Sequence, residues 1–286
     1  MHLKPTEIRE LLGTLGKKPN KSLGQHFLID PSVIHAMIRR ADLLPKDVVL
    51  EVGPGLGVLT NALLDTGANV IAIEQDRSFA LMLGSTLHDR KVSIIHGNAV
   101  EVDWVTTVGN GRWKFIANLP YAVTSLMLRK ALYHPNPPTQ MLVLIQKEVG
   151  ERIQGAGRKV RGVKPSLLSL MVALASSSSR IIRKVPPRCF YPSPRVDSVV
   201  FEIIPLSQQE RIERWGIDPE EVMKVAKQGF AHPRKLLISN LSVGASHAML
   251  SKQEIENILV DIGANPKSRP EDLSLDQWVE LAKRLV

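Results

Sequence analysis

Three residues whose side chains could contribute to a ligand site lie within four positions after an apolar run. The run Trp113–Ala117 is typical of a short buried strand, and "NLPYAVTS" then supplies Asn118, Pro120 and Tyr121. An amide and an outward-facing ring are out of place at the end of a buried strand unless something uses them. Because α/β sheets open their ligand crevice at the carboxyl ends of the strands, we interpret this stretch as one wall of a ligand site.

A second candidate site element is the glycine-rich stretch "VLEVGPGLGVLT", residues 49–60. It predicts a strand, then Gly53-x-Gly55-x-Gly57, then the start of a helix. Glycines let the chain turn sharply and bring backbone N–H groups close to a ligand. Glu74 ends the next predicted strand, 74 − 53 = 21 residues later, which is the spacing of an acid that binds ribose hydroxyls.

Two cofactor classes fit this pattern, a dinucleotide and S-adenosylmethionine (SAM). A pyrophosphate-binding loop usually reads G-x-G-x-x-G, whereas position 58 here is Val and Glu51 lies in the strand that precedes the loop. The pattern is therefore closer to the loop of a SAM-dependent methyltransferase. A purely structural strand–helix turn is the alternative.

The elements that would carry these residues form an α/β domain over roughly residues 20–205, after an N-terminal extension of residues 1–20. Helix-length segments separate most of the first five predicted strands, as a parallel doubly wound sheet requires, and the last two strands are expected to be antiparallel neighbours at a sheet edge. After Pro205 only helical periodicity and capping signals appear, which predicts a small C-terminal helical domain over 206–286. The seven predicted strands are Val48–Val52, Val70–Glu74, Val92–His96, Trp113–Ala117, Met141–Gln146, Arg180–Val185 and Val196–Ile204.

The charge distribution indicates a polyanionic partner. The formal net charge is +9 and the pI is near 9.7. Residues 147–195 hold eleven Lys and Arg against Glu148 and Glu151, so this stretch alone contributes 11 − 2 = +9. Such a concentration favours RNA or DNA over a merely solubilising surface, in which the two signs are usually mixed.

The cysteine, histidine and apolar content of the chain bear on its cellular location and on metal binding. The single cysteine, Cys189, can form neither an internal disulfide nor a thiolate cluster, and the histidines lack metal-ligand spacing. No apolar run reaches the roughly 18–20 residues that cross a bilayer, and the N-terminus has no signal-peptide pattern. We therefore expect a cytoplasmic protein without a structural metal.

Several stretches together resemble the ribosomal RNA adenine dimethyltransferase family (KsgA type), which has the Erm-type resistance methylases as relatives. They follow the family's order along nearly the whole chain, and "GQHFL" with "NLPY" is the most specific combination. The matching stretches are "KSLGQHFLID" (21–30), "VLEVGPGLGVLT" (49–60), "VIAIEQDRSFA" (70–80), "NLPYAVTS" (118–125), "QKEVGERI" (146–153), "FYPSPRVDSVVFEI" (190–203) and, more weakly, "GFAHPRKLLISNL" (229–241).

The resemblance implies a Rossmann-like SAM-binding sheet and assigns roles to individual residues. The reactive centre and target-base pocket would be formed by Asn118, Leu119, Pro120, Tyr121 and Phe190, although Phe190 could equally be a core side chain. The cofactor site would be formed by Gln25, His26, Leu28, Gly53, Gly55, Glu74, Gln75, Asn98, Ala99 and Asn118.

The resemblance also implies the substrate. It is two adjacent adenines in a loop near the 3′ end of small-subunit (16S) rRNA, dimethylated at N6 on an assembling 30S subunit by a monomeric enzyme. The phosphates would be bound by Lys147, Arg152, Arg158, Lys159, Arg161, Lys164, Arg188, Arg195, Arg234 and Lys235.

Three positions depart from the family's pattern. Asn98 stands where Asp is usual at the adenine edge of the cofactor, and Ala122 stands where Asn often follows the tyrosine. The stretch "RGVKPSLLS", residues 161–169, replaces a segment that usually begins with an aromatic residue and glycine. An amide oxygen at position 98 can still accept a hydrogen bond from an adenine amino group, so we expect weaker binding rather than none.

Other functions remain open from the sequence. The fold could serve an RNA-binding ribosome-assembly or transcription factor with a weakened cofactor site. It could also belong to an Erm-type methylase of large-subunit rRNA, or to an NAD-dependent oxidoreductase, which fits the glycine loop least well.

Overall fold

The computed structural model of the chain describes residues 3–19, 25–155, 165–242 and 251–286. Their contacts divide the chain into two compact units. The first comprises residues 1–150 and 178–205, and the second comprises residues 151–177 and 206–286.

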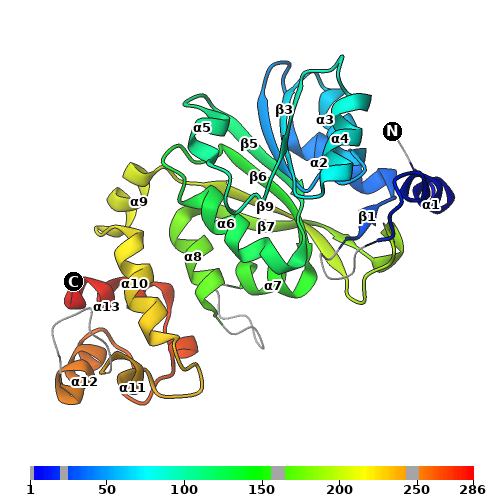
Figure 1. Cartoon of the computed structure of the whole chain (residues 1–286). Coiled ribbons are helices and arrows are strands. Elements are labelled where there is room, and N and C mark those ends of the chain that lie inside the picture. The colour runs from blue at the N-terminus through cyan, green and yellow to red at the C-terminus, as the bar shows by residue number, and fades with distance from the viewer. Residues whose placement is uncertain (1–2, 20–24, 156–164, 243–250) are drawn as a thin grey trace. The chain divides into compact units, whose positions relative to one another are not determined.

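The first unit is built on a seven-stranded sheet with the strand order β4-β3-β2-β5-β6-β9-β7 (Figure 1). The pairs β2–β3, β3–β4, β2–β5 and β5–β6 are parallel, whereas β6–β9 is antiparallel and β7 lies at the edge. This sheet confirms the predicted Rossmann-like α/β class and all seven predicted strands. The strands are β2 (Val48–Val52), β3 (Asn69–Glu74), β4 (Val92–His96), β5 (Trp113–Asn118), β6 (Gln140–Gln146), β7 (Ser176–Val185) and β9 (Ser198–Pro205).

Helices connect these strands and bury their apolar faces against the sheet. Asp30, Asp76 and Asp103 each begin a helix by accepting a hydrogen bond from a backbone N–H of its first turn. Side chains from both layers, such as Met37 and Leu142, are completely buried in the shared core. The helices are α2 (Pro31–Ala41), α3 (Val58–Leu64), α4 (Arg77–Thr86), α5 (Trp104–Val108) and α6 (Thr124–Leu132), and α7 (Lys147–Gln154) follows β6.

The N-terminal extension contains a helix, α1 (Pro5–Thr14), that packs on the first unit. Its buried Ile8 and Leu12 join a small apolar cluster with Phe27, Leu56 and Phe79. Since Leu56 belongs to the glycine-rich loop, this apolar cluster connects α1 to that loop.

A second, two-stranded sheet joins segments far apart in the sequence. Strand β1 (Phe27–Leu28) pairs antiparallel with β8 (Phe190–Tyr191), so that Leu28 lies opposite Phe190. β8 follows the short 3₁₀ helix Pro187–Cys189. Strands of two residues carry no detectable periodicity, so this sheet is not predictable from the sequence.

The described part of the second unit is helical, except for the first residues of β7. Helix α10 packs against α8, α11 and α13, and Trp278 stacks on Phe230 with ring centroids 5.5 Å apart. Capping boxes at Ser207, Ser251 and Ser274 begin three of the helices. The helices are α8 (Leu167–Ala175), α9 (Gln208–Trp215), α10 (Pro219–Gly229), α11 (Leu237–Leu241), α12 (Lys252–Asp261) and α13 (Leu275–Leu285), with a 3₁₀ turn at Pro270–Asp272.

The second unit begins earlier in the chain than the sequence suggested. We expected every residue up to 205 to lie in the first domain, but α8 packs with α10 and α13. The sequence of α8, "LLSLMVALA", is apolar on almost all sides, so this helix needs partners all round. Two helices after Pro205, α10 and α13, pack against it.

Within the described residues, no helix is long and apolar enough to cross a membrane. The same residues contain no group of three or more His, Cys, Asp or Glu side chains placed to hold a metal ion.

Candidate active site

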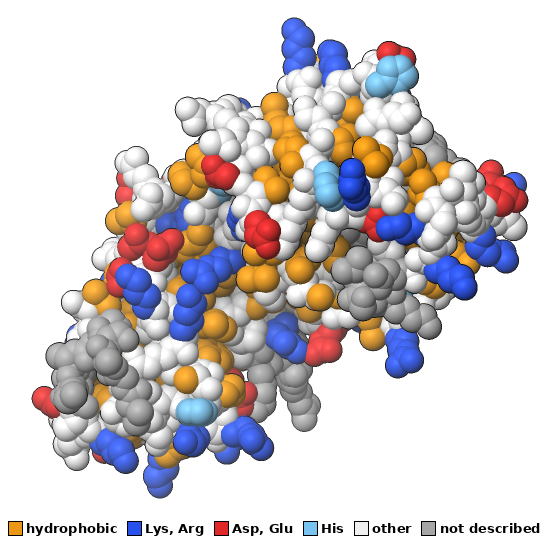
Figure 2. Space-filling model, in the orientation of Figure 1, with side chains coloured by type: hydrophobic (Ala, Val, Ile, Leu, Met, Phe, Trp, Pro, Cys, Tyr) orange, Lys and Arg blue, Asp and Glu red, His pale blue; other side chains and the backbone are white. Residues whose placement is uncertain are grey.

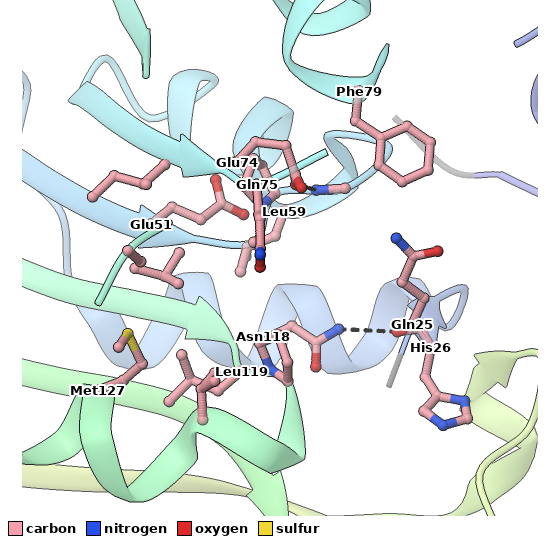
Figure 3. A pocket seen from close by; sticks show the side chains of 18 of the residues that line it. Gln25, His26, Glu51, Leu59, Glu74, Gln75, Phe79, Asn118, Leu119 and Met127 are labelled. Atoms are coloured by element: carbon pink, nitrogen blue, oxygen red, sulfur yellow. Dashed lines mark hydrogen bonds between the residues drawn. The ribbon is translucent and has the colours of Figure 1, made fainter. Parts of the chain in front are cut away.

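One pocket lies at the carboxyl ends of β2, β3, β4 and β5 (Figure 3). The chain runs outward from β2 through β3 to β4 and then returns to the other side of β2 as β5. Loops on either side of β2 therefore diverge, which is where doubly wound sheets bind ligands. The pocket wall combines the glycine-rich loop, the ends of β3 and β4, the residues after β5, and the segment 25–28.

The glycine-rich loop depends on its glycines for both conformation and space. Gly53, Gly55 and Gly57 all have positive φ, between 57° and 78°. A Cβ on Gly57 would lie 2.5 Å from the Leu83 side chain, and one on Gly55 would lie 3.3 Å from the ring of Phe27. The loop can adopt this tight path only with glycine at these positions.

Glu74 ties the end of β3 to the glycine-rich loop. One carboxylate oxygen accepts a hydrogen bond from the backbone N–H of Gly55 at 2.9 Å, and the other accepts from that of Asp76 at 2.8 Å. The side chain is only 6 % exposed, and burial raises its pKa above the ordinary value. Each oxygen retains a further lone pair that a ligand hydroxyl can use.

Glu51 is a second buried carboxyl in the pocket wall. It is 1 % exposed, and its Oε2 has no hydrogen-bond partner among the described residues. Burial raises the pKa of Glu51 to about 8, and the nearby charge of Glu74 also raises it. A buried acceptor or donor without a partner is costly, so this atom indicates where a polar ligand group can be bound.

Asn118 ends β5 and its amide orientation is set by a contact across the pocket. Its Nδ2 donates a hydrogen bond to the backbone carbonyl of His26 at 3.2 Å, drawn as a dashed line in Figure 3. The nitrogen end is thereby engaged, and the oxygen end is presented to a ligand. The ring of His26 is held in turn by Nδ1, which lies 2.7 Å from the Pro192 carbonyl and must donate to it.

Tyr121 stands on the 3₁₀ turn Tyr121–Val123, between β5 and α6. Its hydroxyl is hydrogen-bonded to the buried Ser198 hydroxyl at 2.7 Å, which fixes the ring at the pocket wall. The His26 ring lies beside it, with centroids 5.9 Å apart. Burial raises the pKa of Tyr121, so the phenol stays protonated at neutral pH.

The structure brings almost all residues predicted for the cofactor site and the reactive centre to this one pocket. Every residue expected at the cofactor lines it, as do Leu119, Pro120 and Tyr121 of the expected reactive centre. Asn98 and Ala122, two of the departures from the family pattern, line it as well.

Phe190 is not among the residues that line the pocket. It is 3 % exposed and packs in the main apolar core of the first unit. Side chains alternate between the two faces of a strand, so Leu28 and its partner Phe190 turn toward that core. Their neighbours Phe27 and Tyr191 pack instead with the cluster under α1.

Several pocket residues were not predicted as site residues. Glu51, Phe27, Phe79, Val100 and Met127 all line the pocket. Only Glu51 gave a signal in the sequence, as an acid at the end of a strand that is otherwise apolar. The other four are apolar residues that the sequence does not distinguish from core residues, and only the fold brings them to the pocket.

The cations expected to bind RNA differ in their surroundings. Arg188, Arg195, Arg234 and Lys235 are exposed, whereas Arg152 is half-buried and Lys147 lies 3.8 Å from Asp197. Figure 2 shows Lys and Arg side chains distributed over both units. Four further expected cations lie outside the described residues, namely Arg158, Lys159, Arg161 and Lys164.

Part of the basic stretch has a structural task. Arg180 contacts the buried carboxylate of Glu202 at 2.9 Å, and Arg40 contacts the same carboxylate at 2.7 Å. Arg183 donates hydrogen bonds to Ser32. The charge count of residues 147–195 therefore overstates the charge available to a partner.

Residues 16–284 match the family described as "Ribosomal RNA adenine dimethylase". A protein named "Ribosomal RNA small subunit methyltransferase A" from Syntrophotalea carbinolica is 36 % identical over 271 residues, which cover 94 % of this chain and 97 % of that protein.

Two solved structures share the fold. A dimethyladenosine transferase from Plasmodium falciparum has a TM-score of 0.69 and 21 % identity, covering 90 % of this chain and 96 % of its own. The 23S rRNA methyltransferase ErmE has a TM-score of 0.63 and 23 % identity, covering 91 % and 99 %. At such identities the likeness concerns the fold alone, which is that of Rossmann-like methyltransferases.

The glycine-rich loop gives a first prediction. Gly57→Ala should lower the free energy of unfolding by about 2 kcal/mol, because alanine must adopt a positive φ and displace Leu83. Gly84→Ala, in α4 with open space around it, should raise it by about 0.5 kcal/mol. Urea unfolding measures both, and equal effects of the two substitutions would contradict this interpretation.

Glu51 gives a second prediction, in pH dependence. Its pKa is about 8 in the folded chain against 4.5 ordinarily, so between these values the folded state holds a proton that the unfolded state has lost. The carboxyl therefore lowers the free energy of unfolding as pH rises through this window, whereas the amide of Glu51→Gln does not titrate. Between about pH 5 and pH 8, the free energy of unfolding of the variant should therefore rise relative to that of the wild type by on the order of 3 kcal/mol.

Urea unfolding of both proteins across that range measures the difference. Glu213→Gln, at an exposed carboxyl of α9, serves as the control and should follow the wild type. A difference between Glu51→Gln and wild type that is constant with pH would show that Glu51 does not carry the proton.

Proposed function

Because the chain belongs to the family of ribosomal RNA adenine dimethylases, we propose that it methylates two adjacent adenines in a loop near the 3′ end of small-subunit (16S) rRNA. SAM is the methyl donor of this family. The product would be N6,N6-dimethyladenine at both positions. The subunit assignment is supported by the name of the 36 % identical relative, and the substrate would be a small subunit during its assembly.

The observation that carries this proposal is the orientation of the Asn118 amide. The exocyclic amino group of adenine is a poor nucleophile because its lone pair is delocalised into the ring. With Nδ2 bound to His26, the Asn118 oxygen is the end that can accept a hydrogen bond from that amino group. The Leu119 carbonyl, which precedes Pro120, would accept a second hydrogen bond, and the two together would localise the lone pair toward the methyl group.

The chain's other pocket residues bind and orient the cofactor. SAM supplies a methyl group on a sulfonium centre, which is a good leaving group. Glu74 would bind the ribose hydroxyls, the glycine-rich loop would lie along the methionine part, and residues 97–100 would flank the adenine. The unpartnered oxygen of buried Glu51 fits a polar ligand in the same pocket.

Alignment rather than proton transfer would supply most of the rate. A methylated aryl ammonium is acidic and can lose its proton to water, so no dedicated base is required. The Tyr121 ring, fixed by Ser198, would stack on the target base after that base leaves its helix or loop.

The exposed cations would bind the phosphates of the RNA around this base. Arg188 and Arg195 belong to the first unit, and Arg234 and Lys235 belong to the helical second unit. We propose RNA contacts for both units, and a monomer that acts on ribosomal particles in the cytoplasm.

A second function is favoured by one observation. Ala122 lines the pocket where relatives often have Asn, so it withdraws one hydrogen-bonding group from the reactive centre. An RNA-binding assembly factor with weakened methyl transfer would fit that loss. Single-turnover methyl transfer distinguishes the two, because such a factor would bind SAM and small subunits but transfer methyl groups only slowly.

Methyl transfer from labelled SAM to undermethylated small subunits tests the proposal directly. Wild type should transfer methyl groups, and Asn118→Ala should reduce kcat by roughly 100-fold, because the acceptor for the amino group is lost. Asn110→Ala, at an exposed amide outside the pocket, should behave as wild type. An inactive wild type, or an undiminished Asn118→Ala, would refute the proposal.

The role of Tyr121 as a platform gives a further prediction. Tyr121→Ala should raise KM for the RNA about 5- to 100-fold, since stacking contributes roughly 1–3 kcal/mol per base. Tyr121→Phe keeps the ring and loses only the hydrogen bond to Ser198, and Ser198→Ala loses the same bond from the other side. Both should change KM by less than about fivefold. Equal losses in all three variants would assign the effect to the hydrogen bond instead of the ring.

A further inference from the structure

The loop that follows β4 contains a hydrogen-bonded pair of polar side chains, Asn98 and Glu101. The Oδ1 atom of Asn98 accepts a hydrogen bond from the backbone N–H of Val100 at 3.0 Å. Its Nδ2 donates to a carboxylate oxygen of Glu101, also at 3.0 Å. Turning the amide over would place its NH₂ against an N–H and its oxygen against a carboxylate. Asn98 is therefore locked in one orientation.

The loop that carries this pair is held firmly. The ammonium of Lys130 donates hydrogen bonds to the carbonyls of Ala99, Val100 and Val102 at 2.5–3.0 Å. The indole of Trp104 also donates to the Ala99 carbonyl, at 3.0 Å. Because Lys130 and Trp104 hold the backbone of this loop, substitutions at positions 98 and 101 should change side-chain hydrogen bonds and charge but not the path of the backbone.

The position of the loop in the pocket indicates which part of a bound cofactor Asn98 would contact. Glu74 ends β3 and would bind the ribose, and β4 is the next strand outward, away from the glycine-rich loop. A base attached to that ribose therefore extends toward residues 97–100. The 6-amino group of adenine is a hydrogen-bond donor, and the locked Oδ1 of Asn98 has a second lone pair with which to accept it.

From this arrangement we infer that Glu101 is a positioning residue of the cofactor site, which acts on the adenine through Asn98. It supplies, three residues later, the negative charge that an Asp at position 98 would carry, and it holds Asn98 as an acceptor for the adenine amino group. It also disfavours Asp at 98, because two carboxylates would then lie about 3 Å apart. The inference rests on the proposed function and explains why the amide at this position is compatible with it.

A double-mutant cycle tests the inference. Calorimetry measures the Kd of S-adenosylhomocysteine for wild type, Asn98→Asp, Glu101→Gln and the double variant. Asn98→Asp alone should weaken binding at least about threefold, and adding Glu101→Gln should restore it to the wild-type value or better. Raising the salt concentration should reduce this coupling, since both side chains reach solvent. Asp89→Asn, an equal charge change at an exposed site outside the pocket, should have no effect.

A second ligand separates recognition of adenine from general damage to the site. S-Inosylhomocysteine carries a 6-oxo acceptor in place of the 6-amino donor. Wild type should bind it at least tenfold more weakly than S-adenosylhomocysteine, because its oxygen would face the oxygen of Asn98. Asn98→Ala should reduce that ratio to about threefold or less while keeping detectable binding of both ligands.

The outcomes distinguish this inference from the proposed function. If wild type binds S-adenosylhomocysteine but Asn98→Asp binds as tightly with Glu101 as with Gln at position 101, the role of Glu101 is refuted and the methyltransferase proposal stands. Equal affinity of wild type for the two ligands would refute Asn98 as the adenine acceptor. No binding of S-adenosylhomocysteine by wild type would overturn both.

Discussion

The hydrogen bond from the Gly55 N–H to Glu74 is the contact on which the pocket depends most. It joins the end of β3 to the loop after β2, and the other oxygen of the same carboxylate holds the turn into α4 through Asp76. Two neighbouring loops are thereby fixed by one buried side chain. The carboxylate is at the same time the group expected to bind ribose. Its position is set by the fold before any ligand arrives, so ligand binding need not pay for ordering it.

The opposite wall of the pocket is assembled from segments far apart in the chain. The pairing of β1 with β8 positions residues 25–28, and the His26 carbonyl then orients the amide of Asn118. Ser198 of β9 holds Tyr121 in a similar way. The orientation of the stretch "NLPY" therefore depends on the rest of the fold, because the side chains of Asn118 and Tyr121 are each held by a residue in another element. This explains how a polar residue can end an apolar strand without destabilising it.

The sequence predicted the framework well because its signals are local. The five parallel strands are rich in apolar residues and bounded by turn residues, and the glycine spacing with Glu74 predicts a cofactor loop without reference to tertiary structure. Features set by distant contacts were not predictable. The two-residue strands β1 and β8 have no periodicity, α8 joins the helical unit only because of its all-round apolar surface, and Arg180 reads as a surface cation until Glu202 is seen beneath it. The burial of Phe190 follows from the same β1–β8 pairing.

Methylation of adjacent adenines in small-subunit rRNA is the function that we propose for this pocket. The most direct measurement is mass-spectrometric mapping of modified adenines in ribosomal RNA from cells with the gene and from cells in which it is deleted. We predict N6,N6-dimethyladenine at two adjacent positions near the 3′ end of 16S rRNA, present with the gene and absent without it. An identical modification pattern in both strains, or a loss confined to large-subunit rRNA, would contradict the account.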